Sequence, residues 1–187
     1  RYAQAGAVAL SPGKICVNPD VDTDVVNKTV AASLTAGDLE RKVIIDSAGA
    51  VTGDTYVDGT LTINDATGEG INFSVAGNST VTGAAELSVY LKEPIRVALT
   101  VDVSEATLTQ NQWDDIIISI ADQADMCVGV PNVAFAISAY GWVQTGGDCA
   151  VLWDEAVAKG LALTIGTGTV GAVEALDAAG EAQIGVA

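Results

Sequence analysis

The chain has 187 residues, enough for one domain or two small lobes, and its 49% hydrophobic content argues against intrinsic disorder. Eight Lys and Arg against 24 Asp and Glu give a net charge of −16, which repels phosphate backbones and anionic lipid and argues against a nucleic-acid or membrane partner. The absence of histidine excludes Ser-His and Cys-His nucleophiles and His-based metal sites.

Short strands and tight turns are the predicted architecture. Twenty glycines accompany abundant Val and Thr, a composition typical of an all-β protein. No apolar run reaches the ~18 residues of a membrane helix, and no signal peptide is recognised. Cys16, Cys127 and Cys149 form no CxxC pair, so we expect small buried thiols in a reducing cytosol, with neither a disulfide framework nor a zinc site.

The first half of the chain contains several period-two patterns. Strands are predicted at residues 14–17, at 41–45, and in a hairpin whose arms, 61–63 and 71–75, flank an acidic loop. Residues 87–91 alternate in the same way. Residues 95–103, after Pro94, hold one apolar face for nine residues, the longest such pattern in the chain.

Two acidic stretches are candidate sites. Asp20, Asp22 and Asp24 alternate as in a calcium loop, but the Gly and Glu that such a loop needs are absent, which favours a solvated acidic loop. Asp65 and Glu69 lie at the tip of the predicted hairpin, where a solvated turn is favoured over an acid-base pair. We expect no catalytic residue, no metal site and no cofactor.

The second half begins with a strand at residues 116–118, apolar enough to be buried on both faces, and a loop at 122–125. Gly146-Gly147 then suits a two-residue hairpin turn, which would pair Gln144 with Cys149 and Tyr140 with Trp153.

After this hairpin, one helical turn ending at Gly160 is predicted. A further hairpin follows, with arms at 161–165 and from Val173 onward. The apolar end, 184–187, is expected to be docked unless the chain continues.

Three aromatic residues share one face of the predicted hairpin: Tyr140, Trp142 and Trp153. They could form a sugar-stacking platform, but core or subunit interface is the favoured interpretation. Residues 166–171 spell GxGxxG, but without a following helix the pattern is not a dinucleotide site. The predicted organisation is an N-terminal β-sandwich-like lobe (1–120) and a small C-terminal β-barrel lobe (128–187).

The segment GWVQTGGDCAVLWDEAVAKGLALTIGTGTVGAVEAL, with the closing IGVA, resembles the strand-turn-strand region of tailed-phage capsid decoration proteins. The upstream stretches NPDVDTDVVNKTV and TYVDGTLTINDATGEGINFSV are similar to structural proteins encoded among the head genes of marine phages. The resemblance covers most of the chain. Its motifs are structural, so no functional residue is carried over.

This resemblance implies a non-enzymatic cement protein on the exterior of an icosahedral head, assembled in the bacterial cytoplasm. Its partners would be the major capsid protein and copies of itself, commonly as a homotrimer. A tail, fibre or head-spike module of a virion is the alternative. An enzyme or a carbohydrate-binding module, resting on the acidic pairs or the tryptophans, is the third hypothesis.

Overall fold

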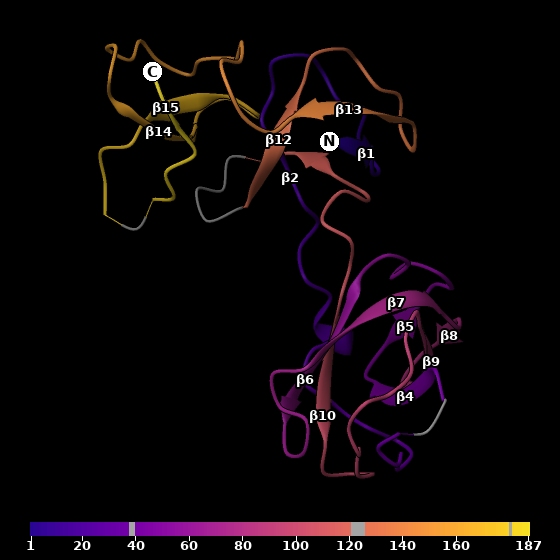
Figure 1. The fold of residues 1–187 in the computed structure, drawn as a ribbon. Helices are drawn as coiled ribbons and strands as arrows, with labels where there is room; N and C mark the ends of the chain where they lie inside the picture. Colours follow the sequence, from indigo (N-terminus) through magenta and orange to yellow (C-terminus); the bar gives the residue numbers. More distant parts are fainter. Residues whose placement is uncertain (38–39, 121–125, 180) are drawn as a thin grey trace. The chain divides into compact units, whose positions relative to one another are not determined.

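The computed structural model describes residues 1–37, 40–120, 126–179 and 181–187. It is all-β, as predicted, and the one helical element among these residues is a 3-10 turn, η1 (Thr23–Val25). The chain forms two compact units (Figure 1). Unit 1 comprises Arg1–Pro19 and Gln112–Ala187, and unit 2 comprises Asp20–Asn111.

This division corrects the predicted lobes 1–120 and 128–187. Residues 1–19 belong with the C-terminal part because β1 (Tyr2–Gln4) and β2 (Cys16–Val17) pair with strands that follow residue 116. Strand pairing is set by hydrogen bonds between distant segments, and a local pattern does not record them. The nearly closed, barrel-like sheet lies in residues 20–111, which the sequence assigned to the sandwich-like lobe.

Unit 2 is a six-stranded antiparallel sheet in the order β3-β10-β6-β7-β9-β4, with a two-stranded ribbon of β5 and β8 (Figure 1). The strands are β3 (Lys28–Thr29), β4 (Lys42–Ser47), β5 (Ala50–Val51), β6 (Thr60–Asp65), β7 (Asn72–Asn78), β8 (Val81–Thr82), β9 (Ala85–Leu91) and β10 (Glu105–Thr109). The predicted hairpin is confirmed: β6 and β7 pair with Leu61 opposite Phe73.

The two ends of this sheet meet. The Ala31 N–H donates to the Ile44 carbonyl over 2.8 Å, and Val30 forms an antiparallel bridge with Ile45. The segment after β3 therefore pairs with β4, so the sheet curves into a nearly closed barrel. Closure satisfies backbone groups that an open sheet would leave unpaired.

Period-two alternation fills the interior of this barrel. In β7, Phe73 and Val75 are fully buried while Asn72 and Ser74 face outward. The same pattern holds in β4, β6 and β9, which confirms the strands predicted there. The fully buried interior side chains on the long strands are Val43, Ile45, Leu61, Ile63, Phe73, Val75, Leu87, Val89, Ala106 and Leu108.

Unit 1 contains a five-stranded sheet in the order β1-β13-β12-β2-β11 and a three-stranded sheet in the order β15-β14-β16. The further strands are β11 (Ile117–Ile118), β12 (Cys127–Pro131), β13 (Tyr140–Gln144), β14 (Ala162–Ile165), β15 (Val173–Ala175) and β16 (Gly185–Val186). The predicted pairing of 161–165 with the strand at Val173 is confirmed, and the apolar chain end is docked on β14 as β16.

The five-stranded sheet also returns to its own beginning. The Ile116 N–H donates to the Gln4 carbonyl (3.0 Å), and the Gly6 N–H donates to the Ile116 carbonyl (2.9 Å), which links β1 to the residue before β11. Phe135 lies in the core cluster of this sheet, where Gly141 leaves room for its ring: a Cβ on Gly141 would lie 2.2 Å from the Phe135 Cζ. The three-stranded sheet packs through a second cluster that joins Ile15 and Val130 to residues of β14 and β15.

The strand predicted over 95–103 is absent. Only Leu99 forms a bridge there, with Leu34, and Asp102 takes a left-handed backbone with φ of 60°. The Thr100 carbonyl accepts from the Val103 N–H, which closes a turn and leaves Val103 exposed. The backbone here makes separate hydrogen bonds, such as those from Ile95 to Glu40 and from Leu99 to Leu34, instead of a continuous ladder, so the alternation alone gave a wrong strand.

The hairpin predicted at Gly146-Gly147 is also wrong. Residues 149–153 form no strand with β13, which pairs instead with β1 and β12. The Gln144 amide donates to the carbonyls of Gly146 (3.1 Å) and Asp148 (2.7 Å), which folds the glycine pair into a local loop. The predicted helical turn before Gly160 is a turn without a helix, and the loop predicted at 122–125 lies outside the described residues.

Replacing Phe73 with Ala tests the interior of unit 2. We expect Phe73→Ala to lower the free energy of unfolding by about 3–5 kcal/mol, because it removes a fully buried ring and leaves a cavity. Ser74→Ala, one residue along on the outward face, should change it by less than about 0.5 kcal/mol. Urea denaturation followed by far-UV circular dichroism measures both. Equal effects of the two variants would contradict the assigned strand faces.

Candidate interaction surface

Three exposed aromatic rings adjoin one another on the outer face of β1 and β13. Antiparallel register places Tyr2 opposite Trp142 and Gln4 opposite Tyr140. The Tyr2 and Tyr140 rings stack with centroids 5.9 Å apart, and Tyr2 meets Trp142 edge-on at 5.4 Å. We call Tyr2, Tyr140 and Trp142 the aromatic cluster.

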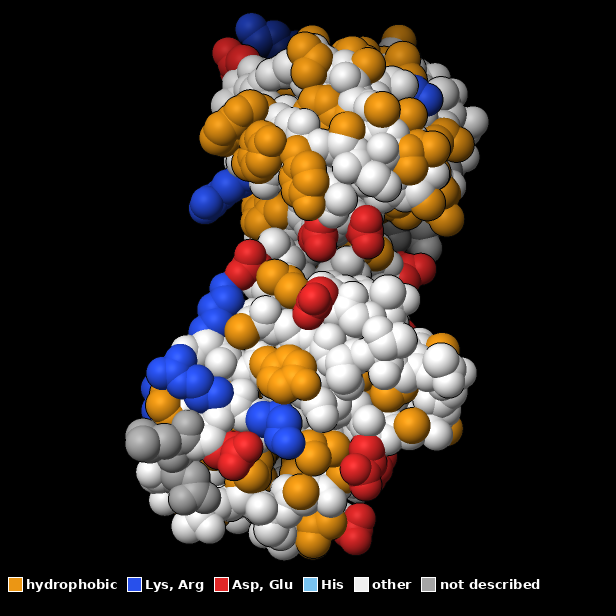
Figure 2. Space-filling view, turned by 90° about the vertical axis from the view of Figure 1, so that its right-hand side faces the viewer, with side chains coloured by type: hydrophobic (Ala, Val, Ile, Leu, Met, Phe, Trp, Pro, Cys, Tyr) orange, Lys and Arg blue, Asp and Glu red, His pale blue; other side chains and the backbone are white. Residues whose placement is uncertain are grey.

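The cluster is strongly exposed. Tyr2, Tyr140 and Trp142 leave 56%, 60% and 70% of their surface accessible. Side chains alternate across a strand, so Val143 points into the core and Gly141 faces the Phe135 ring, while Tyr140 and Trp142 point outward. In Figure 2, hydrophobic side chains gather on the face of unit 1 that is turned to the viewer. Exposed apolar surface of this kind is a candidate for interaction with a partner.

The structure splits the three predicted aromatic residues. Tyr140 and Trp142 lie together, whereas Trp153 forms a bridge with Val173 beside the three-stranded sheet. The core interpretation does not hold, since Trp153 too is 43% exposed; the interface interpretation stays a prediction. Sequence reasoning missed Tyr2, because its position beside Trp142 depends on pairing across about 140 residues.

The acidic candidates act as local backbone partners. Asp22 caps η1 by accepting from the Asp24 N–H, and it also accepts from the Tyr56 hydroxyl over 3.2 Å. Asp65 accepts from the Ala66 N–H at the hairpin tip, where Glu69 is exposed. No group of three or more Cys, Asp and Glu that could hold a metal ion occurs in the part of the chain that the structure describes.

The glycine-rich loop 166–171 binds the protein's own carboxylates. Asp154 accepts from the Gly168 N–H over 2.6 Å, and Glu174 accepts from the Thr167 N–H over 3.2 Å. Hydrogen bonds from the Thr169 hydroxyl and from the loop backbone lower the pKa of Asp154. Backbone N–H groups that could bind a phosphate therefore already donate to the protein's own carboxylates. This is a physical reason why the loop is not a nucleotide-binding motif.

The three thiols are free and differ in burial. Cys16 is completely buried in the core cluster of the five-stranded sheet, and burial raises its pKa to about 12, with a further contribution from nearby Cys127. Burial also raises the pKa of Cys127 and of Cys149, which remain partly accessible. All three are thus protonated near neutral pH, which argues against a nucleophilic cysteine.

Comparison with family models, with curated proteins and with solved structures gave no match to this chain. In the described residues, no helix has the length and apolar character needed to span a bilayer.

Replacing Asp154 with Asn tests the loop contact. Because the folded pKa of Asp154 is lowered, its stabilising effect is present above the unfolded pKa near 3.8 and is lost as pH falls through the folded value. We expect Asp154→Asn to lower the urea midpoint of unit 1 at pH 7 and the difference from wild type to shrink below about pH 4. Tryptophan fluorescence reports on this unit alone, since all three tryptophans lie in it.

Asp148→Asn is the control for this variant, because it removes the same charge from an exposed carboxylate in the same unit. Identical pH profiles for the two variants would show that general charge repulsion, rather than the loop contact, governs the effect.

Thiol accessibility is a separate prediction. In native protein at pH 8, iodoacetamide should modify Cys127 and Cys149 but leave Cys16 unmodified. Cys16 is buried, and its raised pKa leaves very little of it as the reactive thiolate. In urea all three should react. Peptide mass spectrometry over time measures the rates, and native modification of Cys16 as fast as Cys149 would contradict its enclosure.

Proposed function

We propose that this protein is a non-enzymatic structural protein of a tailed-phage virion. It attaches to the outer surface of an icosahedral head, binds the major capsid protein and further copies of itself, and stabilises the capsid. The observation that carries the proposal is the aromatic cluster, an exposed apolar surface on an acidic protein. The resemblance to decoration proteins supplies the kind of partner.

The aromatic cluster has the character of a binding hot spot. Tyr and Trp are enriched among residues that carry most of the binding energy at protein interfaces. A fully covered aromatic side chain buries about 150–250 Å², so three half-exposed rings offer roughly 300–400 Å². A specific interface needs about 800 Å² per partner, so the cluster would form the centre of a larger contact.

The net charge of −16 supports a position outside the head. Packaged DNA is polyanionic, and an acidic protein is repelled from it. The free thiols suit assembly in a reducing bacterial cytoplasm. The homotrimer rests on the resemblance alone.

Undecorated heads provide the test. Added protein should bind in many copies per particle and raise the melting temperature of the heads. Trp142→Ala should weaken binding by about 30-fold or more, the consequence of losing a hot spot worth about 2 kcal/mol. Tyr90→Ala removes an exposed aromatic ring from unit 2 and should bind as wild type does.

Two results would count against the proposal. Heads that melt at the same temperature with and without saturating protein would rule out a stabilising role. Binding in only a few copies per particle would favour the tail, fibre or head-spike alternative.

A further inference from the structure

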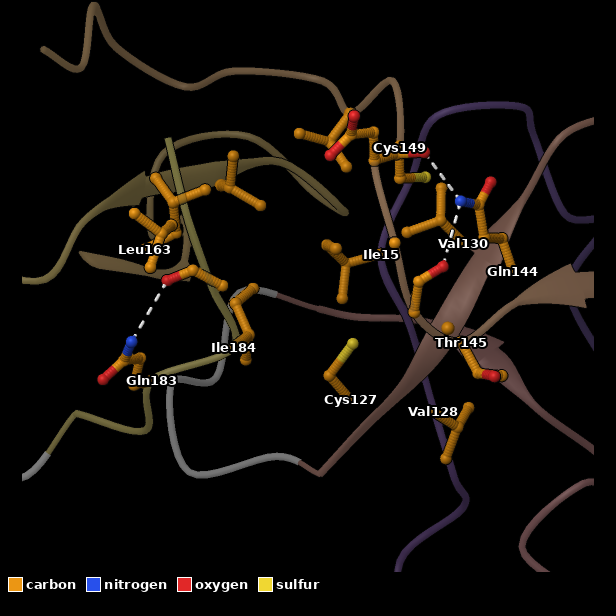
Figure 3. Close-up of a pocket in the computed structure, with 18 of the residues that line it drawn as sticks. Ile15, Cys127, Val128, Val130, Gln144, Thr145, Cys149, Leu163, Gln183 and Ile184 are labelled. Atoms are coloured by element: carbon orange, nitrogen blue, oxygen red, sulfur yellow. Dashed lines mark hydrogen bonds between the residues drawn. The ribbon is translucent and has the colours of Figure 1, made fainter. Parts of the chain in front are cut away.

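We propose that unit 1 contains a binding cavity for a small, uncharged apolar molecule. This inference goes beyond the attachment function and does not depend on it. The cavity has a volume of about 620 Å³ and is lined by residues of both the five-stranded and the three-stranded sheets (Figure 3). Ligand cavities in proteins measure about 300–1,000 Å³.

Apolar side chains form much of the wall. Ile15, Val130 and Leu163 are only 3%, 5% and 6% exposed, and Ile184, just before β16, lines the cavity with them. Figure 3 shows these side chains arranged around the space. An ordered water needs two to four polar partners, and these four side chains offer none. The polar side chains of the lining, Gln144, Thr145, Asp148 and Gln183, lie elsewhere on it, so this part of the wall favours an apolar occupant.

The amides at the cavity are already engaged. Both hydrogen bonds drawn from Gln144 in Figure 3 run to carbonyls of its own loop, and the Gln183 amide donates to the Gly185 carbonyl over 3.4 Å. These contacts orient the amides toward the protein. They leave burial of apolar surface as the main source of affinity.

Charge selects against anions. Asp148 is the one charged side chain among the described lining residues, and no Lys or Arg is among them. A carboxylate or phosphate on the ligand would meet this negative group and a chain of net charge −16, with no cation to compensate. The cavity therefore fits an uncharged molecule.

Two neutral thiols complete the lining. Cys127 and Cys149 both border the cavity, and sulfur is a soft, polarisable contact for apolar and aromatic groups. Because an apolar cavity of about 150 Å³ holds benzene, this larger one has room for fused rings or an aliphatic chain. The thiols also provide a reporter at the cavity wall, whereas Cys16 lies in a different cluster.

The neutral dye N-phenyl-1-naphthylamine is the probe for the test. We expect saturable fluorescence enhancement at one dye per chain, and at least 10-fold weaker binding of the anionic dye 8-anilinonaphthalene-1-sulfonate. Saturating neutral dye should slow alkylation of Cys127 and Cys149 by iodoacetamide several-fold. Absence of saturable binding, or unchanged alkylation of both thiols, would overturn the proposal.

Cavity-filling variants locate the binding. Ile184→Trp should weaken dye binding at least 10-fold, and Val151→Phe, also in the lining, provides a second variant if the first does not fold. Val133→Trp adds the same ring at an exposed position of unit 1 outside the cavity and should bind as wild type does. Thermal melting checks that each variant is folded. Undiminished binding by folded cavity-filling variants would place the dye elsewhere and refute the site.

Discussion

The fold depends on backbone hydrogen bonds that join the two ends of a sheet. No strand in the described chain exceeds seven residues, so each pair of strands contributes only a few ladder bonds. The bond from Ala31 to Ile44 closes the sheet of unit 2, and the bonds between Gln4, Gly6 and Ile116 link the ends of the sheet in unit 1. Sheet edges are templates for uncontrolled pairing, so in these two sheets closure leaves side chains as the main means of contact with other molecules, whereas β15 and β16 remain edge strands of the three-stranded sheet.

Closure also determines which side chains those are. A curved sheet has an inner and an outer face, and a period of two assigns every residue to one of them. In β13, Gly141 makes room for Phe135 inside, and its neighbours Tyr140 and Trp142 must therefore point outward. The small residue in the core and the large rings on the surface are two consequences of the same register. Moving the aromatic cluster to the other face would require a register shift of β13. That shift would place Trp142 where Gly141 now lies, and its ring would clash with the ring of Phe135.

Much of unit 2 was predictable because its strands are long enough to show their period. Residues 41–45, 61–63 and 71–75 each alternate, and an acidic loop joins the last two into a hairpin. The wrong strand at 95–103 has the same alternation, but only Ile95 and Leu99 of its apolar residues are fully buried, and Val101 and Val103 are exposed. A pattern therefore does not by itself establish hydrogen-bonded partners. Leu99 is buried there without a continuous ladder.

Unit 1 was harder to predict because its pairings are non-local. The aromatic character of Tyr140 and Trp142 was visible, but their neighbour Tyr2 comes from the other end of the chain, and the glycine pair pointed to the wrong partner. The cavity between the sheets had no signal at all, since its walls come from separate segments such as Ile15, Val130 and Leu163. Composition predicts that such side chains are buried. Only the packing of one sheet on the other shows where the side chains between them leave a cavity.

Charge connects these surfaces. Some carboxylates serve backbone donors, as Asp154 and Glu174 do in the glycine-rich loop, but most of the net charge of −16 remains to repel other acidic molecules. Desolvating a carboxylate at an interface is costly unless a cation meets it, whereas covering uncharged rings is favourable without any such partner. Close approach is therefore least opposed where the surface lacks charge. In the part of the chain that the structure describes, the aromatic cluster and the apolar cavity are two surfaces of this kind.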